Sequence, residues 1–212
     1  MDLLKYQIGC KIKYKTALEI FKAVFVYKNK YLCAKFLLVV QLNNRGDLRK
    51  MNYHNITKDD MLNGDGLRVV LWVSGCTHHC HNCQNPITWD VAGGLPFDEA
   101  AEKELFEALA KPHCSGITFS GGDPLHPFNR EEVFRLMKRI RQELPNKTIW
   151  LYTGFLWEEI KDIPDIADID VLCEGKFVEE LLDNKLHWVG SSNQRVVDVK
   201  KSLETGEVVL HE

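Results

Sequence analysis

Beyond residue 50, the chain contains four short apolar runs rich in β-branched and aromatic residues, and turn-forming or polar residues bound each run. Runs of this length and composition are typical of strands buried inside a sheet. We therefore predict strands at residues 67–73, 116–119, 148–152 and 169–173.

Between these runs, apolar residues recur every three or four positions, which is the spacing of one helix face. Asp98 stands where an N-terminal cap is expected, and Asn129 with Glu132 three residues later forms a second capping arrangement. Pro145 ends the second periodic segment. The predicted helices cover residues 98–111, 129–144 and 157–161.

The alternation of strands and helices predicts an α/β fold with a mostly parallel sheet and right-handed crossovers. Too few units are present to close an eightfold barrel, so we expect an open, partial (β/α) barrel. In parallel sheets, ligand sites lie at the carboxyl ends of the strands, and the most distinctive polar motifs of this chain follow predicted strands.

Charge divides the chain into two parts. Residues 1–50 hold 11 Lys or Arg and three Asp or Glu, whereas the remainder holds 16 basic and 27 acidic side chains. We predict a basic N-terminal extension over residues 1–50 and a main domain over residues 51–212. The extension has no repeated basic motif, which disfavours a nucleic-acid or membrane-surface arm; a docked helix or a segment that is not normally translated are the alternatives. The acidic main domain also argues against nucleic-acid binding.

Cysteine usage favours a reducing compartment. The seven cysteines are an odd number, and three of them fall within eight residues. We recognise no signal peptide, and the apolar stretch at residues 36–40 is far shorter than the roughly 18–20 residues that cross a bilayer. We therefore expect a cytoplasmic protein without a disulfide framework or a membrane span.

Cys76, Cys80 and Cys83 form a CxxxCxxC motif directly after the first predicted strand. Three thiolates are one fewer than a closed tetrahedral or cubane site requires. In a [4Fe-4S] cluster, the missing ligand leaves one iron open to a small molecule. Zinc with one of the interleaved histidines as fourth ligand is the alternative, although so tight a loop hinders a histidine from reaching the metal of its flanking cysteines.

A second motif follows the second predicted strand, at residues 120–124. Gly121 and Gly122 lack side chains, so their backbone can approach a ligand closely, and Asp123 can accept a hydrogen bond from an ammonium group. The same residues are also ordinary turn formers. The motif gains weight because the cysteine loop follows a neighbouring strand.

These two motifs resemble those of the radical S-adenosylmethionine enzymes. Within that superfamily the chain is most similar to the activating proteins of anaerobic ribonucleoside-triphosphate reductases, which activate a glycyl-radical enzyme. The likeness extends over about residues 51–199. It rests on segments 63–66, 73–83, 120–127, 152–154, 175–177 and 190–194. Most superfamily members have an aromatic residue just before the third cysteine, whereas this chain has Asn82.

The resemblance implies that the three cysteines hold a [4Fe-4S] cluster whose open iron chelates S-adenosylmethionine. It further implies that Asn82, Cys83 and Gln84 lie against the cofactor and that Gly121, Gly122 and Asp123 align its methionine part. Reductive cleavage would then generate a glycyl radical on the large subunit of the reductase. A low-potential donor such as flavodoxin would supply the electron. No side chain of this chain is expected to act as acid or base.

Two other functions compete with this prediction: a small iron–sulfur electron carrier and a zinc-stabilised interaction module. A carrier needs a fourth cysteine ligand, for which Cys114 and Cys173 are the distant candidates, although both are expected to be buried structural residues. Further residues at strand ends could either line the site or serve ordinary loop roles. These are Thr153, Gly154, Gly175, Lys176 and residues 191–194.

Overall fold

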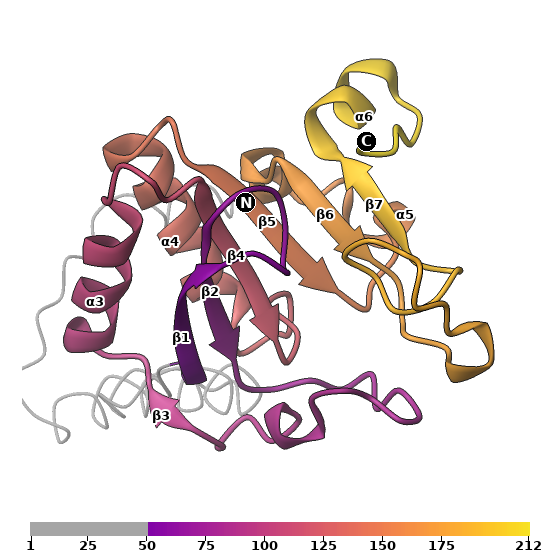
Figure 1. The fold of residues 1–212 in the computed structure, drawn as a ribbon, viewed down its shortest axis with the longest axis horizontal. Coiled ribbons are helices and arrows are strands. Elements are labelled where there is room, and N and C mark those ends of the chain that lie inside the picture. Colours follow the sequence, from indigo (N-terminus) through magenta and orange to yellow (C-terminus); the bar gives the residue numbers. More distant parts are fainter. Residues whose placement is uncertain (1–50) are drawn as a thin grey trace, which may run out of the picture. The chain divides into compact units, whose positions relative to one another are not determined.

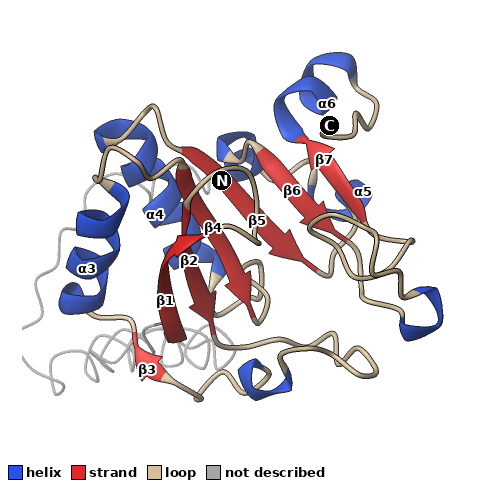
Figure 2. Cartoon of the chain, in the orientation of Figure 1, coloured by secondary structure: helices blue, strands red, loops and turns tan. Residues whose placement is uncertain are grey.

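The computed structural model describes residues 51–212, and the predicted N-terminal extension lies outside the described residues. The described residues form a mixed α/β domain around one seven-stranded sheet (Figures 1 and 2). The sheet order is β3-β1-β2-β4-β5-β6-β7. Its strands are β1 (Asn52–Asp60), β2 (Arg68–Val73), β3 (Leu95–Pro96), β4 (Gly116–Gly121), β5 (Thr148–Thr153), β6 (Val171–Glu174) and β7 (Arg195–Asp198).

The four predicted strands correspond to β2, β4, β5 and β6, and these four pair in parallel in that order. The edges of the sheet were not predicted. There, β1 pairs with β2 and β3, and β7 pairs with β6, each in the antiparallel direction. Edge strands are partly solvated, and apolar and polar residues alternate only weakly along them. Their sequences therefore lack the continuous apolar run that marks a buried strand.

The helices are α3 (Glu99–Leu109), α4 (Arg130–Glu143), α5 (Trp157–Ile160) and α6 (Val199–Thr205). Three 3-10 turns, η2 (Pro86–Thr88), η3 (Pro164–Asp168) and η4 (Glu179–Leu181), complete the described elements. None of the helices within residues 51–212 is long and apolar enough to cross a membrane.

The two predicted helix caps have different outcomes. Asp98 caps α3 as predicted, because its carboxylate accepts from the backbone nitrogens of Ala100 and Ala101. The cap at Asn129 was wrong: its side chain makes no capping bond to α4. Instead, its amide donates to the backbone oxygens of Ser74 and Asp123 at 2.8 and 2.9 Å, so this buried residue joins the starts of the two predicted motif loops.

The two faces of the sheet carry different side chains. Ile149 and Leu151 of β5 belong to the large core, together with the buried face residues of α3 and α4. The intervening Trp150 and the partly buried Tyr152 point to the other face, where they pack with Cys173. This second face bears the candidate site, so one strand supplies both the core and the site.

Candidate functional site

A cavity of about 600 Å³ lies at the carboxyl ends of β2, β4, β5 and β6, on the face of the sheet that carries Tyr152 and Cys173. Its wall includes nearly every residue predicted for the site. The members from the predicted set are Cys76, Cys80, Cys83, Gln84, Gly121, Gly122 and Asp123. Asn82 is not part of this wall.

The cysteine loop is anchored where it leaves β2. Gly75 N donates to Thr88 O at 2.7 Å, and Cys76 N donates to Trp89 O at 3.1 Å. Within the loop, Cys83 N donates to Cys80 O at 3.2 Å, which closes the turn between the second and third cysteines. The three cysteines are therefore half-buried around one cavity rather than dispersed over the surface.

Asn82 closes this turn in the left-handed conformation, with φ of 51°. Asparagine tolerates that conformation, whereas a bulky side chain is strained in it. The backbone at this position thus suits the asparagine that stands here in place of an aromatic residue. The Asn82 amide donates to Glu179 Oε1 at 2.5 Å, and His81 Nδ1 lies 2.7 Å from the other oxygen of Glu179, so the end of the loop is joined to η4.

Gly121 and Gly122 are required by close backbone packing. A Cβ on Gly121 would lie 2.7 Å from Val73 O, and its φ of 99° is also unfavourable for other residues. A Cβ on Gly122 would lie 2.5 Å from Gly75 O. Both glycines line the cavity, but the close approach seen here is to the backbone that leads into the cysteine loop.

Asp123 is 2% exposed, and protein groups occupy both its carboxylate oxygens. Oδ1 accepts from Leu125 N at 2.8 Å, and Oδ2 accepts from Gly154 N at 3.1 Å. Thr153 Oγ1 lies 3.0 Å from both oxygens. His78 Nε2 is 2.5 Å from Oδ2. Asp123 therefore organises the protein around it, in addition to the ligand contact predicted from the sequence.

Several cavity residues were missed or assigned to other roles. His78 was considered as one of the histidines that could bind zinc, but its side chain is buried beside Asp123. Trp89 and Tyr152 contribute aromatic walls. Tyr152 belongs to a segment of the family resemblance but was not predicted as a site residue, and no sequence motif marked Trp89. Helix-like or strand-like spacing does not reveal which aromatic side chains turn towards a cavity.

Burial raises the pKa values of two thiols and one phenol in the cavity, those of Cys76, Cys173 and Tyr152. For Cys76, the nearby charge of Asp123 raises the pKa further, whereas a backbone hydrogen bond at His78 lowers it. Burial raises the pKa of Cys173 to about 12 and also raises the pKa of Tyr152, which is hydrogen-bonded to Cys173. Cys173 is therefore a buried thiol as expected, although it shares the cavity with the three loop cysteines.

Comparisons with known proteins identify relatives of this chain. Residues 62–197 match the family model described as a 4Fe-4S single cluster domain. The chain is 45% identical over 150 residues to the anaerobic ribonucleoside-triphosphate reductase-activating protein of Escherichia coli K12, covering 69% of this chain and 97% of that protein. The corresponding protein of Enterobacteria phage T4 is 44% identical over 146 residues, covering 69% and 93% of the two chains.

The chain belongs to the family of anaerobic ribonucleoside-triphosphate reductase-activating proteins. The protein of the same description from Haemophilus influenzae is 40% identical over 148 residues, or 68% of this chain and 96% of its own. The segment matched by the family model contains all the cavity residues described above. Membership of the family supports an iron–sulfur cluster as a cofactor of this chain.

The family match favours a cluster over a single ion. Residues 62–197 match a 4Fe-4S single cluster domain, and this segment contains Cys76, Cys80 and Cys83, which line one cavity. Zinc requires its ligands to meet at one atom, whereas each thiolate of a [4Fe-4S] cube binds a different iron. The match therefore favours an iron–sulfur cluster over the zinc alternative.

The cavity lining includes a tryptophan with an unpaired polar atom. Trp89 Nε1 is buried and has no hydrogen-bond partner among the described residues. An indole N–H is a donor only, and a buried donor without a partner is unfavourable. Trp89 lines the cavity, but this atom is itself buried and does not face the open space.

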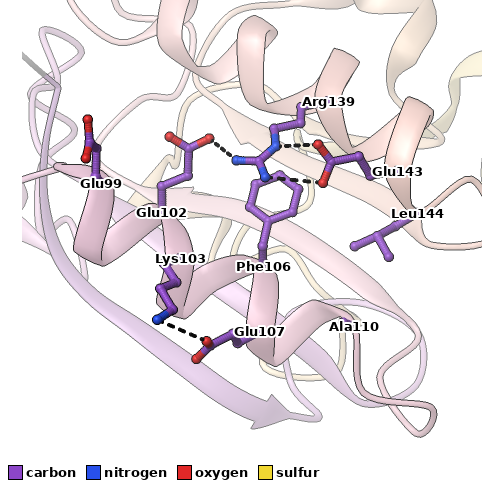
Figure 3. A pocket seen from close by; sticks show the side chains of 9 residues that line it. All are labelled: Glu99, Glu102, Lys103, Phe106, Glu107, Ala110, Arg139, Glu143 and Leu144. Atoms are coloured by element: carbon purple, nitrogen blue, oxygen red, sulfur yellow. Dashed lines mark hydrogen bonds and ion pairs between the residues drawn. The ribbon is translucent and has the colours of Figure 1, made fainter.

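A second recess of about 470 Å³ lies between α3 and α4, on the helix-covered side (Figure 3). Arg139 donates to Glu102 at 2.6 Å and to Glu143 at 2.7 Å, and its guanidinium lies 3.9 Å from the ring centroid of Phe106. These charges pair with one another and hold the two helices together. The recess is thus explained by helix packing.

Proposed function

We propose that this chain activates an anaerobic ribonucleoside-triphosphate reductase by cleaving S-adenosylmethionine reductively at a [4Fe-4S] cluster. The observation that carries the proposal is that Cys76, Cys80 and Cys83 share one cavity with Gly121, Gly122 and Asp123. Three cysteine ligands leave one iron without a protein ligand, and the adjoining turn borders the space in which a chelated molecule would sit. The sheet would correspond to the open, partial barrel of radical S-adenosylmethionine enzymes.

A cluster held by Cys76, Cys80 and Cys83 would supply the one-electron reduction that splits the S–C5′ bond of S-adenosylmethionine, and the hydrogen atom removed in this chemistry would come from a glycine Cα of the reductase. A low-potential donor such as flavodoxin would supply that electron. The protein's contribution is binding, orientation and exclusion of water.

Residues of this chain serve those roles from different strands. The three cysteines would hold the cluster at the end of β2. Gln84 lines the same cavity and would contact the cofactor, as would the backbone at Gly121 and Gly122. Asn82 would act on the cofactor indirectly, by joining the cysteine loop to η4, because its amide is bonded to Glu179. Asp123 would support the methionine part of the cofactor through the ordered turn around it.

Anaerobic reconstitution with iron and sulfide, followed by reduction and addition of S-adenosylmethionine, tests the proposal. We expect stoichiometric methionine and 5′-deoxyadenosine by chromatography. Adding the reductase large subunit should produce a glycyl radical detectable by electron paramagnetic resonance. A protein with all three loop cysteines replaced by alanine is the control. A fully reconstituted wild-type protein that yields neither product would refute the proposed chemistry.

An electron carrier is the second candidate, because the structure places a fourth cysteine on the cavity wall. Cys173 is only 1% exposed and its thiol is hydrogen-bonded to Tyr152, which favours a structural role. A carrier would need Cys173 to close the cluster. Unchanged iron and sulfide content in Cys173→Ala, with cleavage retained, would exclude this candidate.

A further inference from the structure

One histidine of the cysteine loop is buried and bonded to the neighbouring motif. The side chain of His78 is 8% exposed and that of Asp123 is 3% exposed. Nε2 of His78 lies 2.5 Å from Oδ2 of Asp123. Since the carboxylate accepts here, His78 donates in the tautomer that carries the proton on Nε2. By contrast, the side chain of His81 in the same loop is 80% exposed.

The surroundings of His78 are shaped to fit its ring. The ring packs edge-on against Phe155, with centroids 4.8 Å apart and an interplanar angle of 77°. On another side, a Cβ at Gly154 would lie 2.4 Å from Cδ2 of His78. The missing side chain at Gly154 therefore leaves the space that the imidazole fills. Both contacts come from the segment directly after β5.

Asp123 is itself held by other donors, so it provides a fixed acceptor. Thr153 Oγ1 lies 3.0 Å from each of its oxygens, and Gly154 N donates to Oδ2 at 3.1 Å. Leu125 N donates to Oδ1 at 2.8 Å. The bond from His78 thereby connects the cysteine loop to the ends of both β4 and β5. The start of the loop has separate anchors at Thr88 and Trp89, described above.

We propose that His78 is a positioning residue that orders the loop segment between Cys76 and Cys80 before any cluster is bound. Its hydrogen bond to Asp123 would hold this segment against the strand ends, so that the sulfurs are presented to the cavity in one arrangement. Ordering the loop during folding removes that entropic cost from cluster binding. This role of His78 rests on the proposed function in one respect, which is that the group held by the cysteines is a [4Fe-4S] cluster.

Two substitutions separate the hydrogen bond from the packing. His78→Phe keeps an aromatic ring against Phe155 but cannot donate to Asp123. His78→Gln offers an amide donor of similar reach and is the conservative rescue. His81→Phe is the matched control, because its partner Glu179 lies in an exposed pair, and such pairs contribute little.

Hydrogen exchange of the metal-free, full-length protein measures the order of the loop directly. Losing one hydrogen bond of ordinary net strength corresponds to about tenfold in a local opening equilibrium. We therefore expect peptides covering residues 76–83 to exchange about tenfold faster in His78→Phe, with His78→Gln within about threefold of wild type. His81→Phe should stay within about twofold of wild type.

The reconstituted proteins provide a spectroscopic readout. His78→Phe should release iron to a chelator about tenfold faster than wild type and give broadened resonance lines for its reduced cluster, since the sulfurs would sample several arrangements. His78→Gln should narrow the lines again. If His78 only contributed packing, its replacement would lower the global stability, and the amide donor of His78→Gln would not restore the narrow lines.

Wild-type exchange and iron release in His78→Phe would overturn the proposal and leave His78 as a packing residue. If His78→Phe does not fold, Gly154→Ala tests the proposal instead. Its added Cβ would displace the ring of His78 and should therefore give the same faster hydrogen exchange in residues 76–83. Slow exchange in a folded Gly154→Ala protein would likewise overturn it. The exchange measurement needs no cofactor, so failure of S-adenosylmethionine cleavage in the wild-type protein would leave this result standing.

Discussion

Thr153 Oγ1 lies 3.0 Å from both carboxylate oxygens of Asp123, so the last residue of β5 is bonded to the turn that follows β4. The same carboxylate receives His78 from the cysteine loop. One buried acidic side chain thus connects three segments that are far apart in the sequence, and its removal should affect more than ligand affinity.

Asp123→Ala should destabilise the metal-free protein as well as weaken S-adenosylmethionine binding. The change leaves several buried donors without an acceptor, and each such group costs about 1–3 kcal/mol. We expect the free energy of unfolding to fall by about 3 kcal/mol in urea titrations. Asp162→Ala, at an exposed position, is the control and should leave the midpoint nearly unchanged. An unaltered midpoint in Asp123→Ala would show that the carboxylate contributes only to the ligand site.

Replacing Cys76, Cys80 or Cys83 singly by alanine should abolish cluster assembly, because two thiolates cannot hold the cube in the same geometry. Iron and sulfide analysis after anaerobic reconstitution measures this, and cleavage of S-adenosylmethionine should be lost in parallel. Cys114→Ala is the matched control, since this buried thiol lies in the core on the helix side and should cost packing energy alone. Any loop variant that retains full cluster content and cleavage would redefine the ligand set.

Stability should fall in acid partly through Asp170. Burial alone raises the pKa of this carboxyl, but hydrogen bonds from Lys200, Arg141 and Ile149 N outweigh burial and lower the pKa below its ordinary 3.8. The unfolded chain therefore binds the proton first as the pH falls. The stabilisation is complete above the unfolded value, about pH 4, and is lost as the pH falls through the lowered folded value.

Asp170→Asn tests this dependence through urea unfolding at pH 7 and at several values below pH 4. The variant should be less stable than wild type at pH 7, and the difference should shrink as the pH falls. Glu204→Gln, at an exposed position of α6, is the control and should follow the wild-type profile. A difference that stays constant across the pH range would mean that the charge of Asp170 is not the source.

A protein truncated to residues 51–212 should fold, assemble its cluster and generate the reductase radical at an undiminished rate. Every proposed cluster and cofactor residue lies within that range. Electron paramagnetic resonance of the reductase, with full-length and truncated proteins in parallel, measures the outcome. If the truncated protein binds its cluster but produces no glycyl radical, residues 1–50 are needed for docking the reductase.

The parallel centre of the sheet could be predicted because its strands are buried on both faces. Continuous apolar runs identified β2, β4, β5 and β6 to within about two residues, and Pro145 marked the end of the α4 segment. The edge strands carry mixed polarity and depend on pairing with a neighbour, so their sequences alone were not decisive. Their presence became clear only from the completed sheet.

The sequence by itself determined where the candidate ligands stand: three cysteines within eight residues after one strand and a glycine-rich turn after the next. Those features can be predicted because they depend on local spacing and residue type. The tertiary structure decided which groups meet. From its local sequence Asn129 is predicted to cap a helix, but its side chain bonds to Ser74 and Asp123. His78 is one of three histidines in the cysteine loop, and the structure shows it as the buried partner of Asp123. The bonds of Asn129 to Ser74 and of His78 to Asp123 join residues 55 and 45 positions apart. Only the folding of the sheet brings such strand ends together, so that a buried polar group finds its partner.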